Sequence, residues 1–153
     1  MGQRNGSCNG GGEEALEKLE AIQDLCVDTD ILVDFLRGRD PGSTTYKKWK
    51  DKANLLITSI SVFELLMGAQ LSSRRVQRTA EAESLIEQHM VLSLDKAAAT
   101  TASQVGSELK TRGVGVEIRD LFNGSICLTS KIPILTSNKR HYERIRDLSV
   151  ICP

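Results

Sequence analysis

Short apolar runs alternate with longer amphipathic segments over most of this chain of 153 residues. A strand of a parallel sheet is buried on both faces and reads as an unbroken apolar run, and each crossover to the next strand needs a helix. The alternation therefore predicts an α/β fold built from βα units. The runs that we interpret as strands are 25–27, 55–58, 90–94, 132–136 and 149–152.

The segments between these runs predict helices. Residues 31–37 and 62–71 are apolar enough for buried helices, whereas 76–88 is mostly polar and predicts a helix that faces solvent. The next segment repeats apolar side chains at helical spacing and predicts a helix with one face on the sheet. A last helix is expected over about 120–130. The repeating apolar positions are Ala98, Ala102, Val105 and Leu109.

The N-terminal part of the chain has a different composition. Residues 1–12 hold five of the twelve glycines and few apolar side chains, so burial does not offset the entropy of ordering them. Residues 13–23 have the spacing of a short amphipathic helix. We therefore predict a flexible tail with a short helix over 1–24 and one domain over 25–153. The apolar face of that helix is Leu16, Leu19 and Ile22.

The chain carries 20 basic and 20 acidic side chains, so its formal net charge is zero. This balance excludes a protein that coats nucleic acid through bulk charge, and any such contact must come from local patches or a metal. No apolar run approaches the roughly 18 residues of a membrane helix, and the N-terminus lacks an apolar signal segment. We therefore expect a soluble, cytoplasmic protein with no membrane contact. The cysteines form no C-x-x-C pair and are interpreted as reduced thiols: Cys8, Cys26, Cys127 and Cys152.

Acidic residues follow the predicted strands at the edge where an open α/β sheet binds ligands. Asp28 comes directly after the first run, Glu64 follows the second, and Asp120 begins the last helix. Asp30 adds a carboxylate near Asp28, and Asn138 ends the fourth run beside two hydroxyl groups. Hard oxygen ligands of this kind suit Mg²⁺ or Mn²⁺. The pattern indicates a site for a divalent cation.

Each of these acids also has a structural explanation. Asp28 or Asp30 can cap the helix that follows, and Ser61-x-x-Glu64 has the spacing of a capping box. Asp120 can complement the dipole of its helix. Against the capping box, apolar residues on both sides of Glu64 predict a buried helix start, where a lone carboxylate is costly unless it is paired or binds a metal.

Four segments carry motifs of a known family. They are VDTDILVDFLRG at 27–38, ISVFELLMGA at 60–69, DLFNGSICL at 120–128 and LTSNKRHYERI at 135–145. In this order they resemble the motifs of PIN-domain proteins, in particular the VapC-type toxins of bacterial and archaeal toxin–antitoxin pairs. The resemblance extends from residue 25 to the C-terminus.

The resemblance implies an α/β/α sandwich around a five-stranded parallel sheet of strand order 3-2-1-4-5. It places Asp28, Glu64 and Asp120 at the family's metal-binding acids. It also implies a Mg²⁺- or Mn²⁺-dependent endoribonuclease, in which a metal-activated water hydrolyses RNA. Such proteins are commonly homodimeric toxins of type II pairs, neutralised by a cognate antitoxin. Two other functions stay open: an RNA-processing PIN nuclease outside a toxin pair, and a PIN module that binds RNA or protein without cleavage.

The chain departs from the family pattern at three positions. Asp30 stands where Asn is frequent, and it adds either a ligand or only a hydrogen bond. Asn138 stands where many members have a fourth acid, which weakens a second metal site. Asn123 stands where an apolar residue is usual. Next to it, Gly124 costs a helix about 1 kcal/mol relative to alanine, which indicates close approach of another backbone.

Local charge offers a route to RNA despite the neutral total. Six bases stand against two acids in segment 37–52, and five stand against one in segment 131–146, so each has a net charge of +4. Both segments adjoin predicted strands. Arg37, Lys139 and Arg140 are therefore candidates for contacts with the RNA backbone, and a solvated basic surface is the alternative.

Two further pairs of residues each allow two interpretations. Thr136 and Ser137 either support the metal-binding acids or cap a turn, and we favour support over direct ligation. Tyr46 and Trp49 lie among the lysines of the first basic segment, where they either stack on bases or pack in the core. For Trp49, packing is the favoured interpretation.

Overall fold

The computed structural model describes residues 22–153. The predicted tail and most of the predicted helix at 13–23 lie outside the described residues. Five parallel strands form one sheet of order β3-β2-β1-β4-β5, which confirms the expected strand order. The strands are β1 (Asp24–Val27), β2 (Asn54–Thr58), β3 (Met90–Leu92), β4 (Ile134–Leu135) and β5 (Val150–Ile151).

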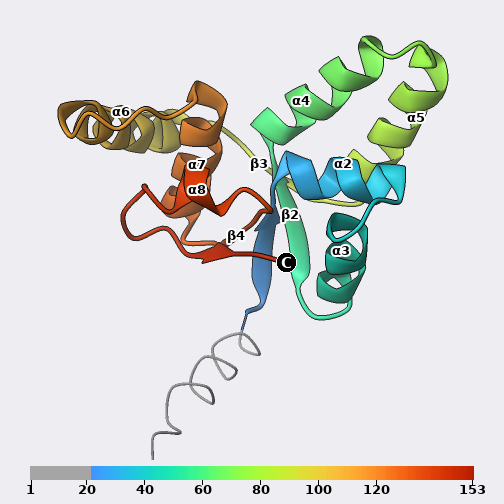
Figure 1. Cartoon of the computed structure of the whole chain (residues 1–153), viewed down its shortest axis with the longest axis horizontal. Coiled ribbons are helices and arrows are strands. Elements are labelled where there is room, and N and C mark those ends of the chain that lie inside the picture. The colour runs from blue at the N-terminus through green and yellow to red at the C-terminus, as the bar shows by residue number, and fades with distance from the viewer. Residues whose placement is uncertain (1–21) are drawn as a thin grey trace, which may run out of the picture.

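Helices cover both faces of this sheet and make the expected α/β/α sandwich (Figure 1). The helices on one face are α2 (Thr29–Arg37), α3 (Gly42–Lys50), α4 (Ser59–Gln70) and α5 (Arg75–Ile86). The helices on the other face are α6 (Lys96–Thr111), α7 (Ile118–Ser130) and α8 (Lys139–Tyr142). None of the helices in residues 22–153 has the length and apolar character to cross a membrane.

Strand β1 separates two hydrophobic cores because its successive side chains point to opposite faces. Leu25 and Val27 pack in the core under α2–α5. Cys26 packs in the other core together with Cys127 of α7, and both are free thiols. Because β1 is the central strand of the sheet, the residue that follows it lies at the middle of the edge formed by the strands' C-terminal ends.

Strands β3, β4 and β5 are shorter than predicted. The residues after β3 lead into α6, where the side chain of Asp95 caps the helix by accepting a hydrogen bond from Ala98 N at 2.8 Å. Pro133 has no N–H to donate to the sheet, so regular pairing of β4 begins only at Ile134. After β4, the backbone N of Thr136 still donates to Ile151 O at 3.0 Å, and its buried hydroxyl donates to Asp28 Oδ2 at 2.8 Å.

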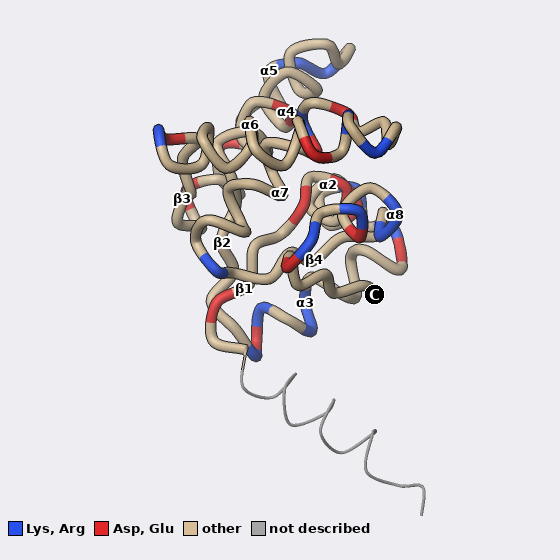
Figure 2. Tube along the Cα trace, turned by 90° about the vertical axis from the view of Figure 1, so that its left-hand side faces the viewer, with Lys and Arg blue, Asp and Glu red and all other residues tan. Residues whose placement is uncertain are grey.

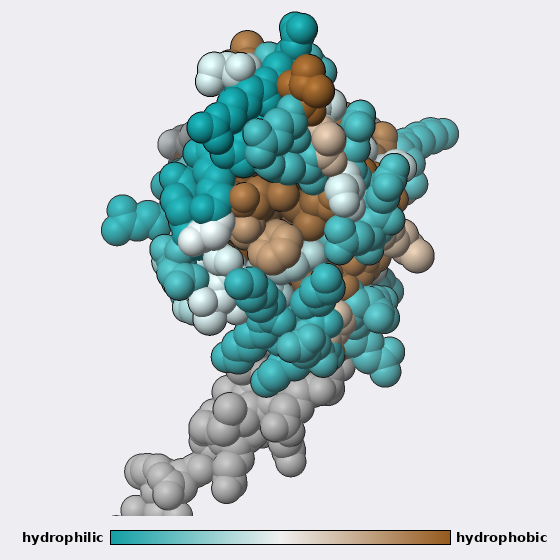
Figure 3. All heavy atoms as spheres, turned by 90° about the vertical axis from the view of Figure 1, so that its right-hand side faces the viewer, coloured by the Kyte–Doolittle hydropathy of each residue, from teal (hydrophilic) through white to brown (hydrophobic). Residues whose placement is uncertain are grey.

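Helix α3 was not predicted, because its buried positions include small and polar residues and its outer positions are lysines. Tyr46 is 1% exposed and Trp49 is 7% exposed, so both belong to the core. The interpretation that they stack on bases is therefore wrong. The ring of Tyr46 stacks on Phe35, with ring centroids 4.0 Å apart. The face formed by α2–α5 is mainly hydrophilic, with an apolar patch near its middle (Figure 3).

Two other expectations about helices need correction. Helix α5 is not purely solvent-facing, because Ala82 and Leu85 are buried in the core. A Cβ added at Gly124 would meet the side chains of Ile145, Leu148 and Tyr142, so glycine makes room for side chains and not for another backbone.

Candidate functional site

The ends of β1, β2 and β4 bring most of the predicted site residues to one edge of the sheet. Asp28 follows β1 and is the N-cap of α2, as the capping explanation expects. Glu64 lies in α4, which begins directly after β2, and Thr136 follows β4. Basic and acidic positions are interspersed over the elements (Figure 2), so the charge of this edge depends on individual contacts.

Uncharged donors hold the carboxylates of Asp28 and Asp30. Asp28 is 7% exposed; its Oδ1 accepts a hydrogen bond from Thr29 N at 2.8 Å, and its Oδ2 accepts one from Thr136 Oγ1 at 2.8 Å. Asp30 Oδ2 accepts from Ser137 N at 2.9 Å. Thr136 and Ser137 therefore support the acids, as the sequence suggested, and these bonds tie β4 to the start of α2.

These two carboxylates lack a positive partner. No ion pair within residues 22–153 includes Asp28 or Asp30. Burial raises the pKa of Asp28 to about 7, and the negative charge of Asp30 raises it as well. Burial also raises the pKa of Asp30. A cation bound here would favour the ionised form of both acids.

Glu64 has a different environment, since a cation already faces it. Its Oε1 pairs with NH1 of Arg119 at 2.9 Å, and its Oε2 accepts a hydrogen bond from Thr29 Oγ1 at 2.5 Å. Arg119 also pairs with Glu117 at 2.5 Å. Glu64 is thus joined to Thr29, the neighbour of Asp28, and also to the start of α7.

The capping box that we considered as the structural alternative for Glu64 is wrong. Thr58 caps α4, with its Oγ1 accepting a hydrogen bond from Ser61 N at 3.0 Å. This part of α4 is also less buried than predicted, because Phe63 is 53% exposed and Met67 is 40% exposed. Glu64 itself stays largely covered, with 17% of its side chain exposed, because it turns toward Thr29 and Arg119.

Asp120 lies in the first turn of α7 and contacts two residues of the C-terminal motif. Its Oδ2 lies 2.6 Å from His141 Nδ1, and its Oδ1 accepts a hydrogen bond from the Tyr142 hydroxyl at 3.4 Å. The same hydroxyl also faces Asp28. Burial, together with the charges of Asp28 and Asp120, raises the pKa of Tyr142. Tyr142 therefore links the first and third predicted acids.

Asn123 was unexplained by the sequence, and the structure gives it a role. It is 1% exposed, its Oδ1 accepts a hydrogen bond from Thr58 Oγ1 at 2.5 Å, and its Nδ2 donates to the Tyr142 hydroxyl at 3.5 Å. Its side-chain amide thus connects Thr58, at the end of β2, to Tyr142, whose hydroxyl faces both Asp28 and Asp120.

The remaining candidates lie on the rim of this edge. Asn138 donates from its backbone N to Thr136 Oγ1 at 2.9 Å, and its side-chain Nδ2 lies 2.9 Å from His141 Nδ1. Lys139 and Arg140 are exposed in α8, and Arg37 is exposed at the end of α2. The sequence did not indicate Arg119, His141 or Tyr142 as site residues.

The acids surround one edge but do not converge on one point. Within the part of the chain that the structure describes, no group of three His, Cys, Asp or Glu side chains is close enough to hold a metal ion. Arg119 and His141 contact two of the three predicted acids, so those acids must reorient before all three can share a ligand. The donor set nevertheless fits a hard divalent cation, because it consists of carboxylates with hydroxyls beside them.

Comparisons with known proteins agree with this geometry. The family model of the PIN domain matches residues 25–148. The chain is 28% identical over 122 residues to the tRNA(fMet)-specific endonuclease VapC of Shigella flexneri, covering 80% of this chain and 92% of that protein. It is 23% identical over 139 residues to ribonuclease VapC1 of Methanocaldococcus jannaschii, covering 90% and 91% of the two chains.

Solved structures resemble the chain in fold. VapBC2 from Rickettsia felis bound to a promoter DNA fragment superposes with a TM-score of 0.78 at 17% identity, over 86% of this chain and 99% of that chain. DNA-bound VapBC from Salmonella typhimurium gives a TM-score of 0.77 at 23% identity, over 86% and 98%. At these identities the likeness shows the fold.

Proposed function

Since the chain belongs to the PIN-domain family, we propose that it is a divalent-metal-dependent endoribonuclease and the toxin of a type II toxin–antitoxin pair. The observation that carries this proposal is the pair Asp28 and Asp30. Both carboxylates are held by uncharged donors, and neither forms an ion pair with a described residue. A structural pair of acids is normally matched by a cation of the protein, whereas a metal site is not.

Asp28, Glu64 and Asp120 would hold the metal, with Asp30 beside them. A bound Mg²⁺ or Mn²⁺ lowers the pKa of water and stabilises negative charge that develops on a phosphate. The hydroxyl of Thr136 fixes the orientation of Asp28, because it donates to one carboxylate oxygen while Thr29 N donates to the other. Supporting bonds of this kind orient metal ligands.

Glu64 and Asp120 can reach a shared ligand at small cost. Their partners Arg119 and His141 have 42% and 44% of their side chains exposed, and exposed ion pairs contribute little to stability. Releasing either partner also leaves it in water and not in the core. The site can therefore close when a cation and an RNA phosphate arrive.

We infer two protein partners. Similar solved structures include a member of the VapBC family of toxin–antitoxin systems from Mycobacterium tuberculosis and a toxin–antitoxin complex from Klebsiella pneumoniae, so a cognate antitoxin is the first. The second is another copy of this chain, because Phe63, Met67 and Leu71 recur at every fourth position and are 53%, 40% and 81% exposed. Such an apolar stripe along α4 and its C-cap Leu71 suits an isologous helix contact.

We infer RNA as the substrate, with Arg37, Lys139 and Arg140 as contacts for its backbone. The relatives from Shigella flexneri and Salmonella typhimurium are named for action on tRNA(fMet), so tRNA is the RNA class to test first. A cytoplasmic location follows as part of the same proposal, because RNA is present there and thiols stay reduced.

The test is cleavage of bulk tRNA by purified, antitoxin-free protein with Mg²⁺ or Mn²⁺. We expect cleavage that stops in EDTA and falls by about 10³-fold in Asp28→Asn, on the order of 4 kcal/mol of transition-state stabilisation. Asp24→Asn is the matched control, because Asp24 is exposed at the opposite end of the same strand. If Asp28→Asn binds RNA as well as wild type does and neither protein cuts it, the chain is a binding module.

The toxin assignment has a separate readout. Expression of the wild-type chain is expected to arrest bacterial growth, and co-expression of the protein encoded beside it is expected to relieve the arrest. Cleavage without arrest, or without a neighbouring antitoxin, would assign the chain to RNA processing outside a toxin pair.

A further inference from the structure

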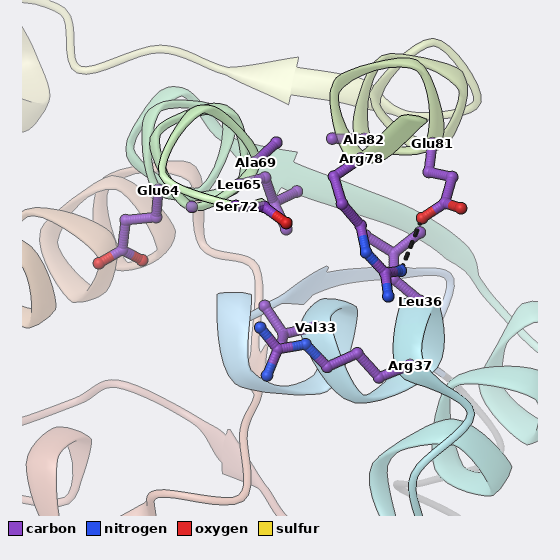
Figure 4. A pocket seen from close by; sticks show the side chains of 11 residues that line it. Val33, Leu36, Arg37, Glu64, Leu65, Ala69, Ser72, Arg78, Glu81 and Ala82 are labelled. Atoms are coloured by element: carbon purple, nitrogen blue, oxygen red, sulfur yellow. Dashed lines mark hydrogen bonds and ion pairs between the residues drawn. The ribbon is translucent and has the colours of Figure 1, made fainter. Parts of the chain in front are cut away.

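A pocket of about 90 Å³ lies between α2, α4 and α5, and Glu64 forms part of its wall (Figure 4). Its apolar lining comes from Val33 and Leu36 of α2 and from Leu65 of α4. The pocket therefore adjoins the candidate active site at Glu64, and none of its other lining residues belongs to the predicted metal site. It lies on the side of Glu64 where α5 packs.

Two arginines bring positive charge to this pocket. Arg78 extends from α5 toward α2, and the guanidinium of Arg37 lies below Val33, on the side where Glu64 stands (Figure 4). Arg78 pairs with Glu81 at 2.7 Å, whereas Arg37 forms no ion pair with any residue in 22–153. One positive charge is thus left without a protein partner beside an apolar floor.

This combination of charge and size suits one phosphate group. The planar guanidinium of Arg37 can donate two parallel hydrogen bonds to a phosphate. Arg78 can add a second donor when it turns from Glu81 to the phosphate. A volume of about 90 Å³ is close to that of about three water molecules. It is well below the roughly 300 Å³ at which sites for whole small-molecule ligands begin.

We propose that Arg37 and Arg78 form a subsite for a phosphate of the RNA strand that flanks the scissile phosphate. The inference rests on the proposed ribonuclease function and deepens it. An RNA strand that places one phosphate at Asp28 and Glu64 continues past Glu64 into the pocket. The arginines hold the next part of its backbone there, and the apolar floor contacts sugar atoms. Glu81 keeps Arg78 directed toward the pocket while no RNA is bound.

The test compares Arg37→Gln/Arg78→Gln with wild type in two assays. Binding of a short, fluorescein-labelled, single-stranded RNA of mixed sequence is measured by anisotropy in EDTA at several salt concentrations. Cleavage of bulk tRNA is measured with Mg²⁺. We expect Kd and KM to rise about tenfold and kcat to stay within about twofold. The slope of log Kd against log salt is expected to fall by about 0.7, because the two arginines together neutralise one phosphate and each neutralised phosphate of single-stranded RNA contributes about 0.7.

Arg75→Gln is the matched control, because Arg75 is an exposed arginine of the same helix as Arg78 and does not line this pocket. It removes one charge and is expected to leave KM and the salt slope near the wild-type values. Thermal unfolding of all variants checks that the fold is retained.

The outcomes separate the inference from the proposed function. If wild type cuts RNA and the double variant has the same KM and salt slope as wild type, the subsite is overturned and the nuclease function stays intact. A double variant that cuts RNA like wild type but escapes inhibition by the antitoxin shows that the pocket binds protein, and this also overturns the subsite. If wild type neither binds nor cuts RNA, the proposed function fails and the subsite with it.

Discussion

The two sides of the candidate active site hold their carboxylates in opposite ways. On one side, Asp28 and Asp30 accept hydrogen bonds from hydroxyl and amide groups and form no ion pair with a described residue. On the other side, Glu64 and Asp120 each contact a basic side chain, at 2.9 Å and 2.6 Å. The first side is fixed by uncharged donors and lacks a cation, whereas on the second side each carboxylate faces a basic side chain that is itself partly exposed.

This difference indicates a division of labour. A buried carboxylate without a cation destabilises the fold, and it persists at a site where an external cation binds. A pair whose basic partner is exposed to water can open and close with little change in free energy. The Asp28 side therefore supplies the fixed position for a metal, and the Glu64 side supplies the ligands that move.

The largest expected effect is on stability and tests the Asp28 side. Asp28→Asn is expected to stabilise the metal-free protein near pH 8 and to change it little near pH 4. A carboxyl group whose pKa is raised in the folded state favours folding only while protonated, so stability is lost as the pH rises from 3.8 to about 7. That interval corresponds to roughly 4 kcal/mol as an upper bound.

Urea unfolding in EDTA at the two pH values measures this difference, with Asp24→Asn as the control. Addition of Mg²⁺ is expected to stabilise wild type and not Asp28→Asn. Equal stabilities of wild type and Asp28→Asn near pH 8 would show that Asp28 is already neutralised inside the protein, and the contrast between the two sides would disappear.

The next effect concerns the support of Asp28. Thr136→Val keeps the shape of this buried residue but removes the hydroxyl that donates to Asp28 Oδ2 and accepts from Asn138 N. We expect kcat/KM to fall about 10- to 100-fold, as for other groups that orient metal ligands. Thr136→Ser is the conservative control and should restore most activity. If valine leaves both activity and the Mg²⁺ dependence unchanged, the Thr136 bond is only structural.

A smaller effect is expected where the two sides meet. Tyr142→Phe removes the hydroxyl that faces both Asp28 and Asp120 and keeps the ring in the core. The variant leaves Asn123 Nδ2 with one partner fewer, so we expect a loss of about 1 kcal/mol in stability. A several-fold fall in Mg²⁺ affinity, measured from the metal dependence of cleavage, would accompany it. An unchanged metal dependence would mean that the two sides act independently.

The sequence predicted the Asp28 side better than the Glu64 side, and the reason is physical. Asp28 directly follows an apolar run, so its place at the sheet edge depends on local pattern alone. The partners of Glu64 and Asp120 come from distant parts of the chain: Arg119 stands in another helix, and His141 is 21 residues from Asp120. No local periodicity encodes such contacts.

Helix α3 and Asn123 show the same limit. The buried positions of α3 include Gly42, Ser43 and Thr45, which match no amphipathic pattern, and only packing against α2 makes them interior. Asn123 has an unusual residue type for its position because its partner Thr58 is 65 residues away. The sequence could mark it as unusual but could not supply the partner.

The smallest expected effect tests whether the Glu64 side is mobile. Arg119→Gln removes the cation from Glu64 and leaves a group that can still hydrogen-bond. Because Arg119 is itself partly exposed to water, we expect a nearly unchanged Tm. Because Glu64 is then free for the metal, we expect half-saturation at a Mg²⁺ concentration several-fold lower than in wild type. The matched control is Arg112→Gln, which removes an exposed arginine paired with Glu108 on α6. An arginine that only competes with the metal for Glu64 weakens metal binding, so its removal must lower the Mg²⁺ requirement. A higher Mg²⁺ requirement or a large fall in kcat in Arg119→Gln, but not in Arg112→Gln, would mean that Arg119 acts on the RNA itself.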